Sequence, residues 1–182
     1  MTQGATTDVW TTPLTPLAFL GRSAEVFAES TAIVYGDRRH TYAEFAAEAT
    51  RVANALAASG VEPGDRVAYL LPNIPEMLVA HFAVPLAGAV LVAINTRLST
   101  EEVRYILDHS AATVLVVDAV LYETVRPVAD ELATVREIVT VVDPAAPGDG
   151  VGSGTSYADL LARGSDAPLP WTVDDERGTI TI

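Results

Sequence analysis

The stretch 64–98 constrains the fold most, because it contains two apolar segments separated by a helical pattern, with turn residues at each boundary. Residues 66–71 are largely apolar and lie between a proline–glycine pair and a proline–asparagine pair, as expected of a strand buried on both faces. Apolar side chains then recur at helical spacing over 74–87, and Gly88 ends this pattern before a second apolar segment at 89–94. Strand, helix and strand in this order predict parallel pairing through a right-handed crossover, and therefore an α/β fold.

The same alternation continues toward the C-terminus. Residues 112–117 and 137–142 are apolar and predict two further strands, while the acidic start of 99–107 predicts a helix. Residues 119–133 have helical spacing, although Pro127 should bend this helix or divide it into two shorter pieces. The fold class predicted is α/β, with a parallel, helix-flanked sheet built from repeated strand–helix units.

A smaller antiparallel unit is predicted ahead of this sheet. Thr15 can cap a helix that runs to about residue 30, and two short strands around Gly36 in 31–42 predict a small N-terminal hairpin. Thr41 followed by Glu44 forms a capping box, which predicts the start of a long helix that ends at Gly60.

The domain organisation follows from these patterns. Residues 1–14 are Thr-rich and are expected to form a flexible N-terminal arm, while 15–182 form one N-terminal α/β subdomain with its core in 64–142. Residues 143–155 are rich in Pro, Gly and small residues and predict a solvent-exposed loop. Residues 178–182 resemble the beginning of a strand, so we expect the chain to be truncated after residue 182.

Composition excludes several classes of partner and chemistry. A net charge of -13 and a pI near 4.4 disfavour binding to nucleic acid, and no apolar run approaches the length of a membrane span. Cysteine is absent, which excludes disulfides and thiolate sites and fits a reducing cytoplasm. All 11 basic residues are Arg, so the chain has no lysine that could form a Schiff base or bind a nucleotide phosphate.

Three patterns have residue types found in functional sites but lack the required context. Gly150, Gly152 and Gly154 do not directly follow a strand, so 150–154 is interpreted as a flexible loop rather than a phosphate loop. His40, His81 and His109 lack the spacing of metal ligands and are interpreted as structural. Asp108, His109 and Ser110 have the residue types of a catalytic triad. Successive residues on a helix point about 100° apart, so these three cannot form one. No catalytic residue and no metal ligand is predicted.

Arg97 and Arg104 are the candidate binding residues, because they flank the start of a predicted helix. The N–H groups and dipole at a helix start favour an anion, and two guanidinium groups beside it would add to this attraction. The alternative is that the arginines form surface salt bridges with Glu101 or Asp108.

Four segments carry a family resemblance: TAIVYGDRRHTYAEF (31–45), GVEPGDRVAYLLPNIPEM (60–77), HFAVPLAGAVLVAINTRLSTEEVRYIL (81–107) and DDERGTITI (174–182). Together they resemble the N-terminal region of adenylate-forming enzymes, most closely acyl-CoA synthetases. The resemblance covers roughly residues 15–182, and the order and spacing of the segments are more specific than any one of them. The segment HFAVPLAGAVL is similar to the sequences of a branch that includes plant-type acyl-activating enzymes for short, medium or aromatic acids.

The resemblance implies an ATP-dependent ligase that needs ATP, Mg²⁺ and CoA. In such enzymes a carboxylic acid substrate attacks ATP to give an acyl-adenylate and pyrophosphate, and the CoA thiol then displaces AMP to give a thioester. The phosphate loop and the catalytic lysine of the family match nothing in these 182 residues. We therefore expect the chain alone to be inactive and to bind none of these cofactors tightly. The remainder of the same polypeptide would be its partner. Arg97 and Arg104 would lie near the CoA entrance.

Two other interpretations remain open at this point. One is a stand-alone α/β module that binds a small ligand at the ends of its strands. The other is an enzyme that adenylates amino or aryl acids for a carrier protein instead of CoA. Self-association is also expected if a sheet edge or an apolar face is exposed.

Overall fold

The computed structural model describes residues 13–146, 154–173 and 175–182, and in these ranges the predicted α/β architecture is confirmed. Five strands form one sheet in the order β4-β3-β5-β6-β7, and every neighbouring pair is parallel. The strands are β3 (Arg66–Leu70), β4 (Val90–Ala93), β5 (Ala112–Asp118), β6 (Glu137–Val141) and β7 (Thr155–Ser156).

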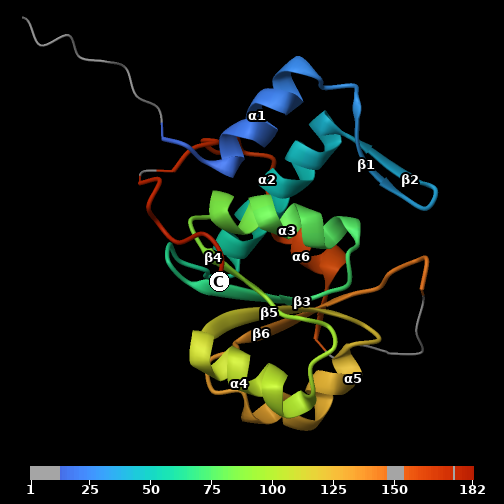
Figure 1. Ribbon diagram of the computed structural model, residues 1–182, viewed down its shortest axis with the longest axis vertical. Coiled ribbons are helices and arrows are strands. Elements are labelled where there is room, and N and C mark those ends of the chain that lie inside the picture. The colour runs from blue at the N-terminus through green and yellow to red at the C-terminus, as the bar shows by residue number, and fades with distance from the viewer. Residues whose placement is uncertain (1–12, 147–153, 174) are drawn as a thin grey trace, which may run out of the picture.

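Helices cover both faces of the sheet, which gives three layers (Figure 1). Because side chains alternate along a strand, Val67 and Tyr69 face one helical layer and Ala68 and Leu70 face the other. The first layer contains α2 (Tyr42–Ala58), α3 (Pro75–Leu86) and α6 (Tyr157–Arg163), with α1 (Pro16–Val26) packed on its outside. The second contains α4 (Thr100–Ser110), α5 (Tyr122–Val125) and the 3₁₀ helix η1 (Arg126–Glu131).

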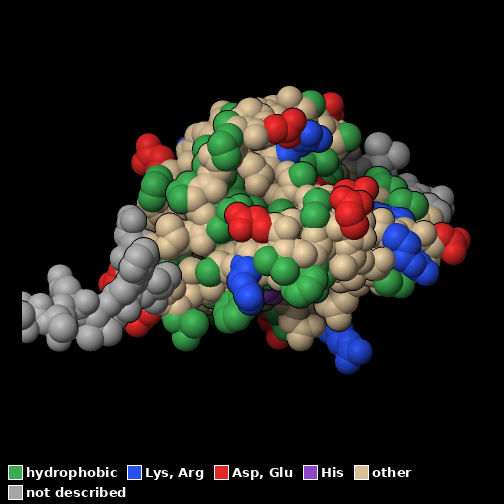
Figure 2. All heavy atoms as spheres, turned by 90° about the horizontal axis from the view of Figure 1, so that it is seen from above, with side chains coloured by type: hydrophobic (Ala, Val, Ile, Leu, Met, Phe, Trp, Pro, Cys, Tyr) green, Lys and Arg blue, Asp and Glu red, His purple; other side chains and the backbone are tan. Residues whose placement is uncertain are grey.

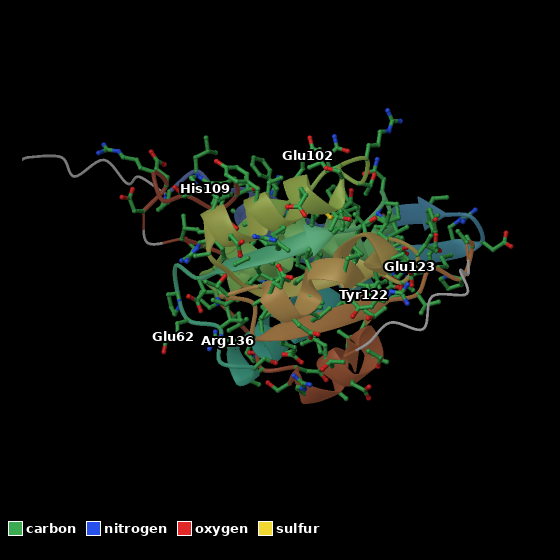
Figure 3. The ribbon with its side chains drawn as sticks, turned by 90° about the horizontal axis from the view of Figure 1, so that it is seen from below. Glu62, Glu102, His109, Tyr122, Glu123 and Arg136 are labelled. Carbon is green, nitrogen blue, oxygen red and sulfur yellow. The ribbon has the colours of Figure 1, made fainter. Side chains whose placement is uncertain are left out.

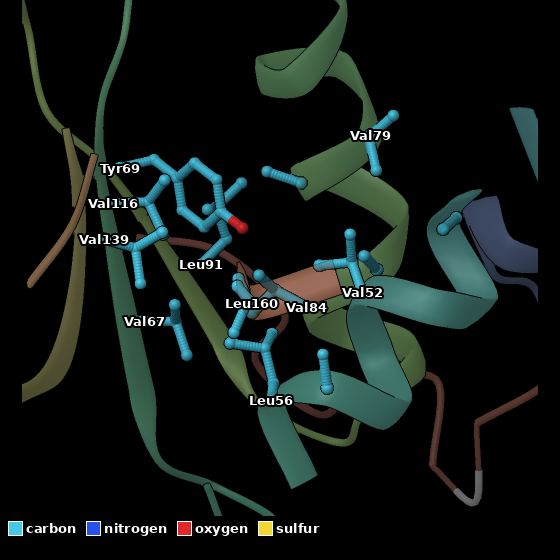
Figure 4. Close-up of a cluster of buried hydrophobic side chains, with 14 of the residues drawn as sticks. Val52, Leu56, Val67, Tyr69, Val79, Val84, Leu91, Val116, Val139 and Leu160 are labelled. Atoms are coloured by element: carbon cyan, nitrogen blue, oxygen red, sulfur yellow. The ribbon is translucent and has the colours of Figure 1, made fainter. Parts of the chain in front are cut away.

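The main core lies between the sheet and the first helical layer (Figure 4). Leu56 of α2, Val84 of α3 and Leu160 of α6 are fully buried there against the strands. Tyr69 projects from β3 into the same layer, with its hydroxyl directed toward the helices. Helices on both faces of the sheet explain why 66–71 is apolar without alternation.

Helix starts are the best-predicted local features. The Thr41 hydroxyl accepts a hydrogen bond from the Glu44 N–H (3.2 Å), while the Glu44 carboxylate accepts one from the Thr41 N–H (2.8 Å), which confirms the predicted capping box. Thr15 caps α1 by accepting a hydrogen bond from the Leu17 N–H, but α1 ends at Val26 rather than near residue 30.

The predicted hairpin is also confirmed. Strands β1 (Thr31–Tyr35) and β2 (Arg38–Thr41) pair antiparallel, and Gly36 occupies the turn with a φ of 55°, which glycine adopts without strain. The hairpin projects from one side of the first helical layer (Figure 1).

Pro127 divides the predicted helix 119–133 as expected. The segment contains the single helical turn of α5 followed by η1, and Pro127 lies in the first turn of η1. Proline lacks the N–H that an α-helix would use at this position, so the chain continues as a tighter 3₁₀ helix.

Two expectations for the C-terminal part need correction. Asp143 opens the segment predicted as an exposed loop but is buried, and Thr155 at its end pairs with Val139 as part of β7. Residues 147–153, which include Gly150 and Gly152, lie outside the described residues, as do residues 1–12 of the predicted arm. The expected strand at 178–182 is reduced to one isolated parallel bridge between Thr181 and Leu91 of β4.

Residues 164–173, here called the return segment, run from α6 across α2 to α1. The Asn54 amide donates to the carbonyl oxygens of Ser165 (2.9 Å) and Ala167 (3.0 Å), which ties the segment to α2. Trp171 then packs directly over Gly21 of α1, where a Cβ would lie only 2.7 Å from the indole ring. Gly21 is therefore required by the close approach of this side chain.

Side chains of different character are mixed on the face seen in Figure 2. Over the described part of the face in Figure 2, acidic, basic and hydrophobic side chains are interspersed. Within the described ranges, no helix combines the length and apolar character that a membrane span requires.

Candidate functional site

A ligand site is expected at the carboxyl edge of the parallel sheet, because open α/β sheets bind ligands where connections diverge from neighbouring strands. The chain leaves β3 toward β4 on one side and leaves β5 toward β6 on the other. Four polar residues end or follow strands at this edge: Asn73, Asn95, Asp118 and Asp143.

The described contacts show that three of these residues shape their own loops. The Asp118 carboxylate accepts hydrogen bonds from the N–H groups of Val120 (2.9 Å) and Leu121 (3.3 Å). The Asn95 side-chain oxygen accepts one from the Arg97 N–H (3.0 Å). Asp143 similarly accepts one from the Ala145 N–H, so these groups organise the edge.

The second Asp143 oxygen connects the edge to the hairpin. It accepts a 2.6 Å hydrogen bond from the Tyr35 hydroxyl, although the two residues are 108 positions apart in sequence. This bond to Asp143 is the main reason that the pKa of Tyr35 is raised above its ordinary value. The hairpin is thereby fixed against the end of β6.

An open, mainly apolar cleft of about 320 Å³ lies between β1 and the start of α3. It is adjacent to the residues that follow β3, so it opens near the carboxyl edge. Its shape and lining suit an apolar group. The lining residues are Ile33, Val34, Tyr35, Asn73, Ile74, Pro75, Met77, Leu78 and His81.

A cluster of ionisable side chains lies at one end of the first helical layer, and we call it the Glu48 cluster. The Glu48 carboxylate accepts a 3.2 Å hydrogen bond from the Tyr157 hydroxyl of α6, and its other oxygen lies 3.9 Å from Nδ1 of His40. Arg38 donates a 2.7 Å bond to one oxygen of Glu76. The members are Arg38, His40, Glu48, Tyr69, Glu76 and Tyr157.

Two buried oxygen atoms in this cluster have no hydrogen-bond partner among the described residues. They are Oε2 of Glu76 and the hydroxyl of Tyr69, and these two residues are 8% and 0% exposed. Burial, followed by the negative charge of Glu76, raises the pKa of Glu48, while His40 and the Tyr157 hydrogen bond act in the opposite direction. Burial raises the pKa of Tyr157 well above its ordinary value. The cluster therefore disfavours ionised Glu48.

The predicted binding residues Arg97 and Arg104 have different environments. Arg97 is exposed just after β4. Arg104 forms ion pairs with Glu131 of η1 (3.0 Å) and with Asp108 one helical turn later (3.8 Å). The Asp108 pair is one that the salt-bridge alternative named, whereas the Glu131 pair was not expected.

The start of α4 already has an internal acceptor. The Glu102 carboxylate accepts hydrogen bonds from both the N–H (2.8 Å) and the hydroxyl (2.7 Å) of Ser99, and these bonds lower the pKa of Glu102. Figure 3 shows Glu102 and His109 toward opposite ends of α4. An external anion would compete with Glu102 at this helix start.

A site for Mg²⁺ and ATP would need clustered oxygen ligands and cations beside the phosphates. Among the described residues, no group of three or more His, Cys, Asp or Glu side chains is arranged to hold a metal ion. His109 instead stacks on Tyr105, with ring centroids 5.4 Å apart. Because the sequence also has no lysine, no adenylation step is assigned to this chain.

Local patterns missed the Glu48 cluster because its members come from distant parts of the chain. Glu48 and Tyr157, for example, are 109 positions apart. One signal was available: Tyr69 lies in the middle of an apolar strand, and a buried tyrosine normally needs a partner for its hydroxyl.

Comparison with known proteins gives consistent matches. The family model for the AMP-binding enzyme matches residues 20–171. A 4-hydroxybutyrate–CoA ligase from Metallosphaera sedula is 37% identical over 180 residues, which cover 97% of this chain and 32% of that ligase. The chain thus spans about a third of the length of the curated relatives that it matches.

Solved structures agree with the fold. An anthranilate CoA ligase in complex with anthranoyl-AMP matches with a TM-score of 0.78 and 27% identity, over 90% of this chain and 31% of that one. A long-chain-fatty-acid–CoA ligase from Archaeoglobus fulgidus has a TM-score of 0.80 at 23% identity, over 95% of this chain and 34% of that one, and supports the fold alone.

Proposed function

Because this chain belongs to the AMP-binding enzyme family, we propose that the protein containing it is an ATP-dependent acyl-CoA ligase. Its reaction would activate a fatty or aromatic carboxylic acid as an acyl-adenylate and transfer the acyl group to the thiol of CoA. The supporting observation is the 37% sequence identity with a 4-hydroxybutyrate–CoA ligase over 97% of this chain.

Within that enzyme, the role we propose for these residues is structural support and part of the CoA entrance. The sheet and its two helical layers would form a wall beside the catalytic centre. Arg97 is exposed, so its guanidinium is free to bind a phosphate of CoA. Arg104 would bind the same ligand after giving up its ion pair with Glu131. ATP and Mg²⁺ would be bound by residues outside this chain.

The test is an ATP–pyrophosphate exchange assay on the full-length protein with a panel of acids. The panel should contain 4-hydroxybutyrate, 2-methylpropanoate, butyrate, cinnamate and anthranilate, the acids named for some of its relatives and structural neighbours. We expect acid-dependent exchange with at least one of them, followed by CoA-dependent release of AMP. No exchange with any acid, including long-chain fatty acids, would contradict the proposal.

The acceptor thiol is tested separately. Acyl transfer to CoA supports the ligase, whereas transfer only to a phosphopantetheinyl carrier protein supports the carrier-dependent alternative. Binding of a small ligand without exchange would support the stand-alone module.

We also propose that residues 1–182 alone do not catalyse adenylation. Loss of one preorganised electrostatic donor can cost roughly 3–4 kcal/mol of transition-state stabilisation, and this chain has no lysine at all. Exchange above background by the purified chain would contradict this expectation. Sedimentation of the same sample would test the predicted self-association.

A cytoplasmic location is proposed from the absence of cysteine. Several relatives have peroxisomal in their names, including an acetate/butyrate–CoA ligase from Arabidopsis thaliana. Imaging of the tagged full-length protein would distinguish the two compartments.

A further inference from the structure

Helix α1 is attached to the rest of the molecule through a small buried surface. Of its 11 residues, three are buried: Leu17, Leu20 and Gly21. Leu20 belongs to the main core. Leu17 instead forms a separate cluster with Ala53 of α2 and Leu86 of α3, here called the Leu17 cluster. Part of the burial of α1 therefore lies outside the main core.

The return segment supplies the other side of this burial. Its apolar side chains, Trp171 among them, pack against the Leu17 cluster. The Trp171 indole also covers Gly21 so closely that a Cβ there would lie 2.7 Å from the ring. Just beyond the segment, the Glu176 carboxylate accepts a 2.8 Å hydrogen bond from the Leu14 N–H, although these residues are 162 positions apart. Helix α1 and the return segment thus bury each other.

The return segment is held on α2 by exposed polar contacts. Residues 164–173 form neither a helix nor a strand. The Asn54 amide donates to two carbonyl oxygens of the segment, and the Arg51 guanidinium donates two hydrogen bonds to Asp166, at 2.6 Å and 3.0 Å. Exposed ion pairs contribute little to stability. A segment with few buried contacts and exposed hydrogen bonds opens at a lower free-energy cost than a core does.

We propose that α1 and the return segment form one latch, which opens and closes as a single unit across α2 and α3. Each half loses a buried partner when the other leaves, because Trp171 covers Gly21 and both halves pack on the Leu17 cluster. Opening uncovers an apolar patch of α2 and α3 that includes Ala53 and Leu86. The sheet keeps its helical layers, since α2, α3 and α6 supply most of the main core.

Asn54→Ala tests whether the two halves are coupled. Among the described residues, the Asn54 side chain bonds to the return segment and not to α1. Alanine is the best helix former, so the substitution does not weaken α2. An isolated helix of 11 residues is marginal in water, so a detached α1 loses its helical hydrogen bonds and its amides exchange.

Two rates are measured on the full chain under native conditions. Amide hydrogen exchange in α1 should accelerate by roughly five- to tenfold in Asn54→Ala, because hydrogen bonds that hold the latch closed are lost. Chymotrypsin cleavage after Trp171, located by mass spectrometry, should accelerate by the same factor, since both rates follow the population of one open state. Thr50→Ala is the matched control. Thr50 is also a half-buried polar residue of α2, but its hydroxyl donates to Ala46 within the same helix, so both rates should stay close to those of the wild type.

Three results would overturn the proposal. Faster cleavage after Trp171 with unchanged exchange in α1 would show that the return segment opens by itself. Unchanged rates of both would show that the Asn54 hydrogen bonds do not hold a latch closed. In the wild type, equal protection of α1 and β3 would show that α1 leaves only when the whole chain unfolds, whereas the latch requires α1 to exchange while β3 stays protected.

Discussion

The Tyr35 hydroxyl donates a 2.6 Å hydrogen bond to a buried oxygen of Asp143, and this bond joins the N-terminal hairpin to the end of β6. The hairpin contributes no strand to the main sheet, so its position depends on such side-chain contacts. The bond has a consequence that can be measured by titration.

Tyr35 should titrate above the ordinary tyrosine pKa of about 10, because the Asp143 carboxylate accepts a hydrogen bond from its hydroxyl and repels the phenolate charge. Since folding raises this pKa, the contribution of Tyr35 to stability is present below pH 10 or so and is lost as pH rises through the folded value. Asp143→Asn should lower the pKa of Tyr35 toward the ordinary value. Tyrosine-resolved NMR titration of both proteins measures this change, and an unchanged Tyr35 midpoint in Asp143→Asn would contradict it.

Replacement of Tyr69 by Phe should increase stability. The Tyr69 hydroxyl is fully buried and has no partner among the described residues, so its removal relieves a desolvation cost of about 1–3 kcal/mol. We expect the free energy of unfolding to rise by about 1 kcal/mol. Tyr157→Phe is the matched control, because it deletes a hydroxyl bonded to Glu48 and should lower stability. Urea denaturation of both variants checks the expected opposite signs.

Ala111→Gly should also stabilise the protein. Ala111 follows α4 with a φ of 50°, in the left-handed region that costs a residue with a Cβ about 1–2 kcal/mol. Glycine removes that strain, but it also gives the unfolded chain more conformational entropy, which offsets part of the gain. The free energy of unfolding should therefore rise by roughly 0.5–1 kcal/mol. Ala47→Gly, at an exposed position inside α2, should instead lose about 1 kcal/mol. Equal losses at both positions would show that α4 does not end as described.

In the full-length protein, Arg97→Ala and Arg104→Ala should raise the KM for CoA while acid-dependent ATP–pyrophosphate exchange stays unchanged. The reason is that a guanidinium–phosphate contact would act only in the thiol half-reaction, and its loss typically costs about 1.5–3 kcal/mol, or roughly 10- to 150-fold in KM. Arg126→Ala is the control, because Arg126 is exposed and pairs with Glu123 on the neighbouring turn. Unchanged kinetics in both half-reactions would remove these arginines from the CoA entrance.

The sequence best predicted those structural features that depend on residues close together in the chain. Thr41 and Glu44 predicted a helix start because both halves of a capping box lie within one turn, and Pro127 predicted a broken helix for a similarly local reason. Apolar runs predicted the parallel strands because burial on both faces excludes polar residues.

The missed features all depend on contacts between distant segments. Thr155 becomes a strand residue only because β6 lies beside it, and its two-residue strand has no pattern of its own. Asp143 looked like the first residue of an exposed loop, yet Tyr35 covers it from the hairpin. No local pattern could place Glu48 beside Tyr157, and the Arg104–Glu131 pair depends equally on how η1 folds back on α4.

The pairing of residues 180–182 with β4 has a consequence for the order in which the protein assembles. The Leu91 N–H donates a hydrogen bond to the Ile180 carbonyl (3.0 Å), and the Leu91 carbonyl accepts one from the Ile182 N–H (2.9 Å). The outer side of β4 is therefore bridged, at Leu91, only after the return segment has crossed the helices. At a synthesis rate of about 5–20 residues per second, roughly 5–20 s separate the appearance of Leu91 from that of its partners. During this interval Leu91 lacks both bonds, and the apolar edge strand β4 is open to pairing with another copy of the chain.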